Sequence, residues 1–311
     1  MGVGYGYGKT ILFGEHFVVY GMPSIASALE SKTTCKVERI EGNTYVLVDE
    51  RPATPGYKKE KFEEQAASIE NVFLAAGLST SGNPVRITFG GDLKAASGVG
   101  ASAASCAALA RALNDEFSLG FDDKRINEIA YEGEKGYHGT PSGIDNTAAV
   151  YGGFIWFVKN LSGGENTMEL LKIGKPVEIV IGNSGLTSST KEVVGDVRKL
   201  KEGNPEKFGR IMGEYGGIAD NARHTLQAYD LHGVGKLMDR CHSLLQEITV
   251  SCKELDLMVE ASRKAGAYGA KLTGTGRGGL MVALTPGKSL QEEVAKAIEA
   301  EGFFAIRTKI G

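Results

Sequence analysis

The stretch from Leu93 to Asn114, LKAASGVGASAASCAALARALN, constrains this chain more than any other part of the sequence. Its glycines let main-chain N–H groups approach a ligand closely, because no Cβ stands in the way. The alanine-rich segment predicts a helix from about Ala101, and the start of a helix carries unpaired N–H donors and a partial positive charge. The combination favours a phosphate site, with the hydroxyl of Ser102 within reach of a phosphate oxygen or a metal ion. A small-residue helix packed tightly on a sheet is the alternative interpretation.

The composition is that of a globular protein with one or two domains, at 311 residues, 42% hydrophobic and 23% charged. A net charge of −3 gives no electrostatic case for nucleic acid or for an anionic membrane surface. No apolar run is long enough to cross a bilayer, and no signal peptide is recognisable at the start. The four cysteines lack metal-ligand spacing, so free thiols and a cytoplasmic location are expected.

The apolar periodicity predicts a mixed α/β (α+β) fold. Strands are expected at 10–20, 34–40, 44–48, 85–89, 152–158, 177–181, 270–273, 280–284 and 303–308. Helices are expected at 59–76, 123–138, 188–202, 205–228, 232–247, 251–265 and 288–300. The polar, glycine-containing segment near 160–167 indicates a boundary between two domains, 1–160 and 161–311.

Two polar segments near the N-terminus have more than one interpretation. The string Gly8-Lys9-Thr10 resembles the end of a Walker A motif, but the glycine required five residues before Gly8 is replaced by Val3. The sequence instead predicts a strand over 10–20, which begins directly after Lys9 and contains the pair Glu15-His16 among apolar residues. Polar groups in such a setting are costly unless they are paired or functional, and a solvated edge or bulge is the alternative.

Acidic and glycine-rich motifs also occur later in the chain. Glu134 and His138 are four residues apart on a predicted helix and therefore share a face. Asp145 follows a turn crowded with glycine and proline, where it could point into a cleft or cap the next segment. The loop Gly274–Gly279 is longer than a hairpin requires, which indicates either space for a ligand or an ordinary turn.

These groups together match the needs of phosphoryl transfer from ATP. That reaction requires main-chain donors for the triphosphate, oxygen ligands for Mg²⁺, and groups that orient or deprotonate the acceptor hydroxyl. The sequence supplies each kind of group, with a lysine and an aspartate as the central pair.

The order of the motifs resembles the GHMP kinases over nearly the whole chain. The motifs are Gly8-Lys9-x-x-Leu12-x-Gly14-Glu15-His16-x-Val18-Val19-Tyr20-Gly21, Ser97-Gly98-Val99-Gly100-Ala101-Ser102-Ala103-Ala104, His138-Gly139-Thr140-Pro141-Ser142-Gly143-Ile144-Asp145-Asn146 and Lys271-Leu272-Thr273-Gly274-Thr275-Gly276-Arg277-Gly278-Gly279. The Glu-His-x-Val-Val-Tyr-Gly run favours the members whose acceptor is mevalonate over the galactokinase-like members.

The resemblance implies a two-lobed fold, with a β-rich N-terminal lobe built on a ribosomal-S5-like core, a helix-plus-sheet C-terminal lobe, and the active site between them. It implies that ATP phosphorylates the primary hydroxyl of (R)-mevalonate to give 5-phosphomevalonate, an isoprenoid precursor, and it suggests a homodimer. Asp145 would act on the hydroxyl beside Lys9, and Ser102 and Glu134 would hold Mg²⁺. The nucleotide would contact Ser97, Gly98, Val99, Gly100, Ala101, Ser102, Gly274 and Gly276, and the acceptor would contact Glu15, His16 and Thr190.

Three departures from the family pattern concern affinity and nucleotide preference more than reaction type. The loop before Lys9 lacks the usual proline, and Ala101 replaces one of two usual serines. Arg277 stands where a glycine is usual, and its guanidinium could reach the phosphates or point to solvent. The alternative functions are a kinase for a sugar, homoserine or a mevalonate phosphate, and a nucleotide-binding protein without turnover.

Overall fold

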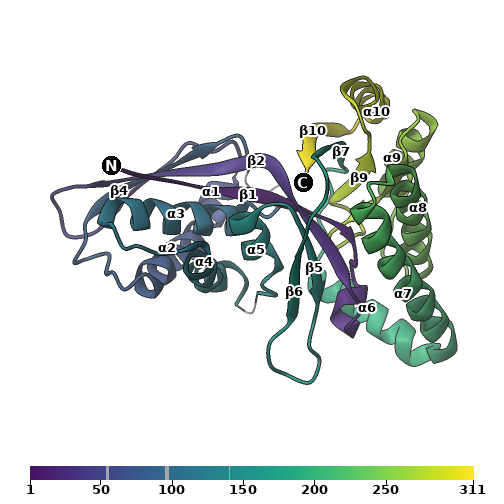
Figure 1. Cartoon of the computed structure of the whole chain (residues 1–311), viewed down its shortest axis with the longest axis horizontal. Coiled ribbons are helices and arrows are strands. Elements are labelled where there is room, and N and C mark those ends of the chain that lie inside the picture. Colours follow the sequence, from purple (N-terminus) through teal and green to yellow (C-terminus); the bar gives the residue numbers. More distant parts are fainter. Residues whose placement is uncertain (54–55, 95–97, 140) are drawn as a thin grey trace. The chain divides into compact units, whose positions relative to one another are not determined.

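A computed structural model describes residues 1–53, 56–94, 98–139 and 141–311, and the chain divides into two compact units. The first unit consists of Met1–Lys9 and Ala28–Gly152, and the second of Thr10–Ser27 and Gly153–Gly311. The helices and strands can be followed in Figure 1. They confirm the predicted mixed α/β class.

The first unit packs helices against a small sheet. Its elements, two of whose strands continue into the second unit, are β1 (Gly2–Phe13), β2 (Ser24–Arg39), β3 (Val46–Asp49), α1 (Tyr57–Glu60), α2 (Phe62–Ala75), β4 (Val85–Gly91), α3 (Ala101–Phe117), α4 (Asp123–His138) and α5 (Ile144–Tyr151). Strand β4 pairs with β2 in antiparallel and with β3 in parallel orientation. Apolar residues of β2, β4, α2, α3 and α4 form one buried core, which fixes the helices that carry site residues.

Alternate glycines of β1 lie directly against the alanines of α3. A Cβ at Gly2, Gly4 or Gly6 would lie 2.2, 2.2 or 2.3 Å from the carbonyl oxygen of Ala112, Ala108 or Ala104, respectively. The glycines recur every two residues along the strand and the contacted alanines every four residues along the helix, and each of these intervals spans about 6–7 Å. The strand therefore runs antiparallel to the helix and brings Lys9 to the helix start, where a Cβ on Gly100 would lie 3.3 Å from the Lys9 Cβ.

The second unit combines a helical bundle with an antiparallel sheet in the order β10-β7-β9-β8. Its elements are β5 (Phe154–Val158), β6 (Thr167–Leu171), β7 (Val177–Asn183), α6 (Thr190–Gly203), α7 (Pro205–Gln227), α8 (Leu231–Glu247), α9 (Lys253–Lys264), β8 (Gly269–Thr273), β9 (Leu280–Leu284), α10 (Lys288–Ala300) and β10 (Phe304–Ile310). Helices α8 and α9 pack on β8, so the bundle supports the strand that leads into the Gly274–Gly279 loop.

The structure corrects the expected strand 10–20. Strand β1 begins at Gly2 and ends at Phe13, and Phe17–Tyr20 forms a single 3₁₀ turn. The chain turns at Gly14, whose φ is +114° and whose Cβ position would lie 2.5 Å from the Cβ of Ser24. Glu15 and His16 therefore lie in a turn, not in the middle of a strand.

Two further differences concern segments that the apolar pattern did not identify. Strand β6 pairs with β5, so residues 160–166, which were expected to be a linker, join the two strands of a hairpin. Helix α5 begins directly after the turn that precedes Asp145. Among the described residues, no helix combines the length and the hydrophobicity that a membrane span requires.

Candidate active site

The first unit brings Lys9 and Asp145 into an ion pair. The Nζ of Lys9 lies 2.9 Å from Oδ1 of Asp145, and the two side chains are 11% and 31% exposed. Lys9 is held by its strand and by a hydrogen bond of 2.7 Å from its main-chain N–H to the carbonyl of Val99. Asp145 lies in the first turn of α5, after Gly143 with φ +90°, and the start of a helix is a favourable place for a carboxylate. The predicted central pair thus meets in space.

Glu134 lies near this pair, on α4, with 1% of its surface exposed. Burial, followed by the charge of Asp145, raises the pKa of Glu134 to about 7, whereas the Ser102 hydroxyl and Lys9 lower it. Its Oε1 atom is buried and has no hydrogen-bond partner among the described residues. A buried carboxylate oxygen of this kind fits a hard cation, and Mg²⁺ in phosphoryl-transfer sites takes only one or two protein ligands. No cluster of three or more acidic, histidine or cysteine ligands occurs in the described part of the chain.

The glycine loop before α3 places main-chain donors beside these groups. Gly98 and Gly100 have φ of +74° and +73°, and Gly100 precedes α3 without a side-chain cap on the helix. Ser102 follows in the first turn, and its Oγ lies 3.4 Å from Nε2 of His138 at the end of α4. The predicted nucleotide contact at Ser97 lies outside the described residues. The start of α3 therefore presents main-chain N–H groups, and Ser102 a hydroxyl, to an anionic ligand.

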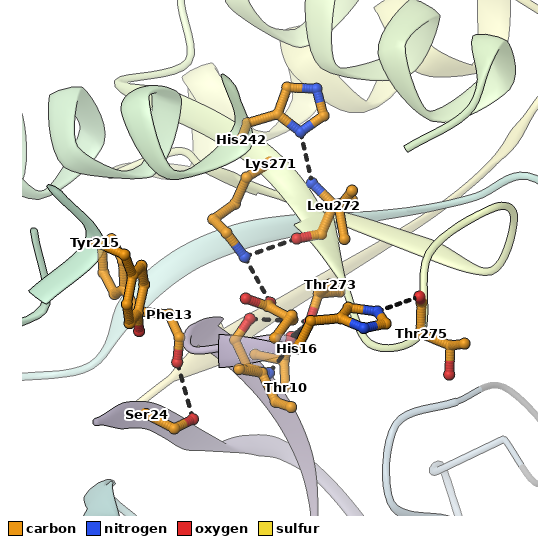
Figure 2. Close-up of polar contacts among 12 residues, drawn as sticks. Thr10, Phe13, His16, Ser24, Tyr215, His242, Lys271, Leu272, Thr273 and Thr275 are labelled. Atoms are coloured by element: carbon orange, nitrogen blue, oxygen red, sulfur yellow. Dashed lines mark hydrogen bonds and ion pairs between the residues drawn. The ribbon is translucent and has the colours of Figure 1, made fainter. Parts of the chain in front are cut away.

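In the second unit, His16 is held by the main chain of the Gly274–Gly279 loop, as Figure 2 shows. Its Nε2 lies 2.6 Å from the carbonyl oxygen of Thr275. Because a carbonyl only accepts, Nε2 carries the proton, and burial lowers the pKa of His16, which keeps the ring neutral. Nδ1 is then an acceptor, and it is buried without a partner among the described residues. A ligand hydroxyl is the kind of group that would satisfy it.

Glu15, the neighbour of His16, forms a buried ion pair with Lys271 of β8. The Nζ of Lys271 lies 2.5 Å from Oε1 of Glu15, and both charged side chains are 0% exposed. The same Nζ lies 2.7 Å from the carbonyl oxygen of Leu272 (Figure 2). Burial raises the pKa of Glu15, and Lys271 opposes that change. The pair ties the Gly14–His16 turn to the strand that leads into the Gly274–Gly279 loop, and Glu15 has its principal partner inside the protein.

Thr190, the third residue predicted to contact the acceptor, meets the same loop. It is the first residue of α6, and its Oγ1 lies 2.9 Å from Oγ1 of Thr275. In the loop, Gly274 and Gly276 have φ of +87° and +79°. A Cβ at Gly276 would lie 2.0 Å from the carbonyl oxygen of Val250, so only glycine fits there.

Sequence reasoning assigned no role to three residues that contact the predicted site. They are His138 beside Ser102, Lys271 beside Glu15, and Thr275 between His16 and Thr190. Lys271 left a signal, because a lysine within the apolar run Ala270–Leu272 requires a buried partner. The contact of Thr275 with His16 left none, since it is made by a main-chain carbonyl, and the contact of its hydroxyl with Thr190 depends on tertiary structure.

Comparisons with known proteins identify the family of this chain. The family described as "GHMP kinases N terminal domain" matches residues 63–153, and "GHMP kinases C terminal" matches residues 222–303. Mevalonate kinase of Thermococcus sibiricus is 35% identical over 97% of this chain and 94% of that protein. A crystal structure of L. major mevalonate kinase in complex with R-mevalonate matches with a TM-score of 0.95 and 39% identity, covering 100% of this chain and 96% of that one. The Methanococcus jannaschii enzyme, at 22% identity, shares the fold with a TM-score of 0.83 over 99% and 98%. The chain therefore belongs to the GHMP kinases and, within them, to the mevalonate kinases.

Proposed function

We propose that this enzyme transfers the γ-phosphoryl group of ATP to the primary hydroxyl of (R)-mevalonate, giving 5-phosphomevalonate and ADP. The observation that carries the proposal is the ion pair of Lys9 and Asp145, 2.9 Å apart beside the buried Glu134. The acceptor is supported by a relative that is 39% identical and was crystallised with R-mevalonate.

The central pair accounts for the chemistry at the acceptor oxygen. That oxygen attacks the γ-phosphorus, the bond from the γ-phosphorus to the bridging oxygen breaks, and ADP leaves. The carboxylate of Asp145 orients the hydroxyl and takes its proton, which is worth about 10²- to 10⁴-fold in rate for general-base catalysis. The ammonium of Lys9 stabilises the negative charge that develops on the acceptor oxygen as the proton moves.

Glu134 and Ser102 are the residues that would hold Mg²⁺, since their oxygens are the ligands this ion prefers. Bound there, the ion would neutralise charge on the phosphate oxygens of ATP. We assign the main-chain donors from Gly98 to Ser102 to the phosphates, and Gly274 and Gly276 to the nucleotide side. His16 and Thr190 are assigned to the acceptor. Glu15 is assigned to it beside His16: Lys271 pairs with Oε1 of its carboxylate, and Oε2 is buried without a hydrogen-bond partner among the described residues. A cytoplasmic location and a homodimer are parts of the same proposal.

A coupled assay of ADP release with a panel of acceptors tests the reaction. We expect turnover with (R)-mevalonate and little with galactose, homoserine or phosphomevalonate. Faster turnover with one of the other acceptors would assign the enzyme to another branch of the family. No ADP release with any acceptor would favour a nucleotide-binding protein without turnover.

The variant Asp145→Ala tests the central pair. We expect kcat to fall by about 10²- to 10⁴-fold, the range that general-base assistance contributes. ATP binding, measured by calorimetry, should persist because the glycine loop is unchanged. A variant that retains at least half of the wild-type kcat would contradict the role of Asp145.

A further inference from the structure

Arg277 adopts a main-chain conformation that residues with a Cβ rarely use. Its φ is +50°, and such a conformation persists only where surrounding contacts fix it. Its main-chain N–H donates to the carbonyl of Val250 at 2.8 Å, the same oxygen that leaves no space for a Cβ on Gly276. The Gly274–Gly279 loop therefore packs closely against the turn between α8 and α9.

The Arg277 guanidinium is directed at the protein, and it joins the loop to two other elements. Its Nη1 lies 2.6 Å from Oδ2 of Asp196 on α6. Its Nε and Nη2 donate to the main-chain carbonyl and the hydroxyl of Thr249, at 3.0 and 3.3 Å, in the α8–α9 turn. Lys199 also pairs with Asp196, at 3.0 Å, but among the described residues it forms no hydrogen bond or ion pair with the loop.

The loop held in this way carries the contacts to both assigned acceptor residues. The carbonyl of Thr275 fixes the ring of His16, and the hydroxyl of Thr275 meets Thr190. Ser188, just before α6, donates to the carbonyl of Gly276 at 2.6 Å. The loop is therefore attached to α6 twice, at its first turn through Thr275 and further along it through Arg277.

We propose that Arg277 is a positioning residue for the acceptor: by joining the loop to Asp196 and Thr249, it holds Thr275 where it orients His16 and Thr190. The proposal rests on the proposed function, because that function assigns His16 and Thr190 to the acceptor. Arg277 acts through Thr275 and does not contact the substrate.

Steady-state kinetics of four variants tests this role. Arg277→Asn removes the guanidinium but keeps a residue that tolerates positive φ, and Asp196→Ala removes its partner without changing the loop. We expect each to raise KM for mevalonate about 5- to 20-fold, less than the direct loss of a charge-assisted hydrogen bond because Arg277 acts on the acceptor through Thr275, with kcat within about threefold. The double variant should be no worse than the more affected single variant, and Lys199→Ala should match the wild type.

Amide hydrogen exchange of the ligand-free protein provides a readout that needs no substrate. Exchange at Thr275 and in the first turn of α6 should speed up in Arg277→Asn and Asp196→Ala but not in Lys199→Ala. An unchanged KM for mevalonate, additive effects of the two substitutions, a rise confined to the KM for ATP, or unchanged exchange would each overturn the role of Arg277. A wild-type enzyme that does not phosphorylate mevalonate would instead refute the proposed function, whatever the exchange result.

Discussion

The imidazole of His16 donates to a main-chain carbonyl, and this one contact decides which of its nitrogens can accept a hydrogen bond. Nε2 is committed to Thr275, so only the buried Nδ1 is left to accept from a ligand. Main-chain groups hold other side chains in the same way, such as Lys271 through the carbonyl of Leu272. At the scale of single residues, hydrogen bonds to main-chain groups position the side chains of the site as much as ion pairs do.

The assignment of His16 leads to a pH dependence. Burial lowers the pKa of His16 below its ordinary value of 6.5, so the ring stays neutral from pH 7 to below 6.5 and then gains a proton on Nδ1. The measurement uses saturating Mg²⁺ and ATP, so that Glu134, whose pKa burial raises to about 7, stays a carboxylate. Under these conditions we expect kcat/KM for mevalonate to stay level over that range and then to fall, because a protonated Nδ1 cannot accept.

Two substitutions of His16 separate the roles of its nitrogens. Asparagine keeps an acceptor near the Nδ1 position, and glutamine keeps a donor near the Nε2 position. We expect KM for mevalonate to rise about 5- to 20-fold in His16→Gln and less in His16→Asn. The decrease of kcat/KM at acidic pH should be altered in both variants. The reverse order would place the essential hydrogen bond on Nε2.

The buried pair of Glu15 and Lys271 predicts an asymmetric effect on stability. Glu15→Gln leaves the Lys271 ammonium buried without a counter-charge, which should lower the free energy of unfolding by about 3–5 kcal/mol in chemical denaturation. Lys271→Met should cost less, because burial already raises the pKa of Glu15 and the carboxyl can become neutral. The double variant Glu15→Gln/Lys271→Met should recover part of the loss. Equal effects of the two single variants would contradict this account.

At the scale of elements, the contact between β1 and α3 leaves no space for side chains. Gly4→Ala would place a Cβ 2.2 Å from the carbonyl oxygen of Ala108, and a helix backbone cannot yield without moving the start of α3. We expect a loss of about 1–3 kcal/mol in the free energy of unfolding, together with a higher KM for ATP. Gly209→Ala in α7 is the matched control, since nothing lies within 4 Å of its Cβ position, and it should stabilise by about 0.5–1 kcal/mol. Equal stability of the two variants would rule out close packing as the reason for the glycines.

The elements that were predicted well are those with a clear apolar period and a defined end. Helix α4 has the predicted bounds, and the side chain of Asp122 caps it by accepting from the main-chain N–H of Arg125. The apolar run of β9 was also located correctly. Strand β1 was misplaced because its first half is glycine and tyrosine, so its packing surface is backbone and leaves no hydrophobic signal. Strand β6 was missed because only Leu171 in it is buried.

The site was predictable where motifs set the residue types and unpredictable where contacts depend on tertiary structure. The meeting of Lys9 and Asp145 followed from the motifs and their resemblance to a family. The contacts of Thr275 did not follow, since one uses a main-chain carbonyl, which every residue has, and the other joins its hydroxyl to Thr190 in a distant segment. The direction of the Arg277 side chain depends on Asp196 and Thr249, which lie in segments without a recognisable motif.

At the scale of the whole molecule, the family resemblance extends over nearly the whole chain. The two matched family regions are 63–153 and 222–303, and the relative from Thermococcus sibiricus aligns over 97% of the chain. Residues assigned to the reaction come from both compact units, with Lys9 and Asp145 in the first and His16 and Thr190 in the second.

The path of the chain between the units also limits how the gene can be divided. The backbone crosses from one unit to the other after Lys9, after Ser27 and after Gly152, so a single cut cannot separate them. A fragment starting at Gly153 would lack Thr10–Ser27 and would contain Lys271 without Glu15. We expect this fragment to be insoluble when expressed alone and to become soluble when a peptide spanning Thr10–Ser27 is fused to it, as measured by size-exclusion chromatography. Soluble, folded fragment without the peptide would show that the inserted segment is dispensable. If the fragment needs the peptide, split reporters and domain exchanges in this family should be designed around three junctions instead of one.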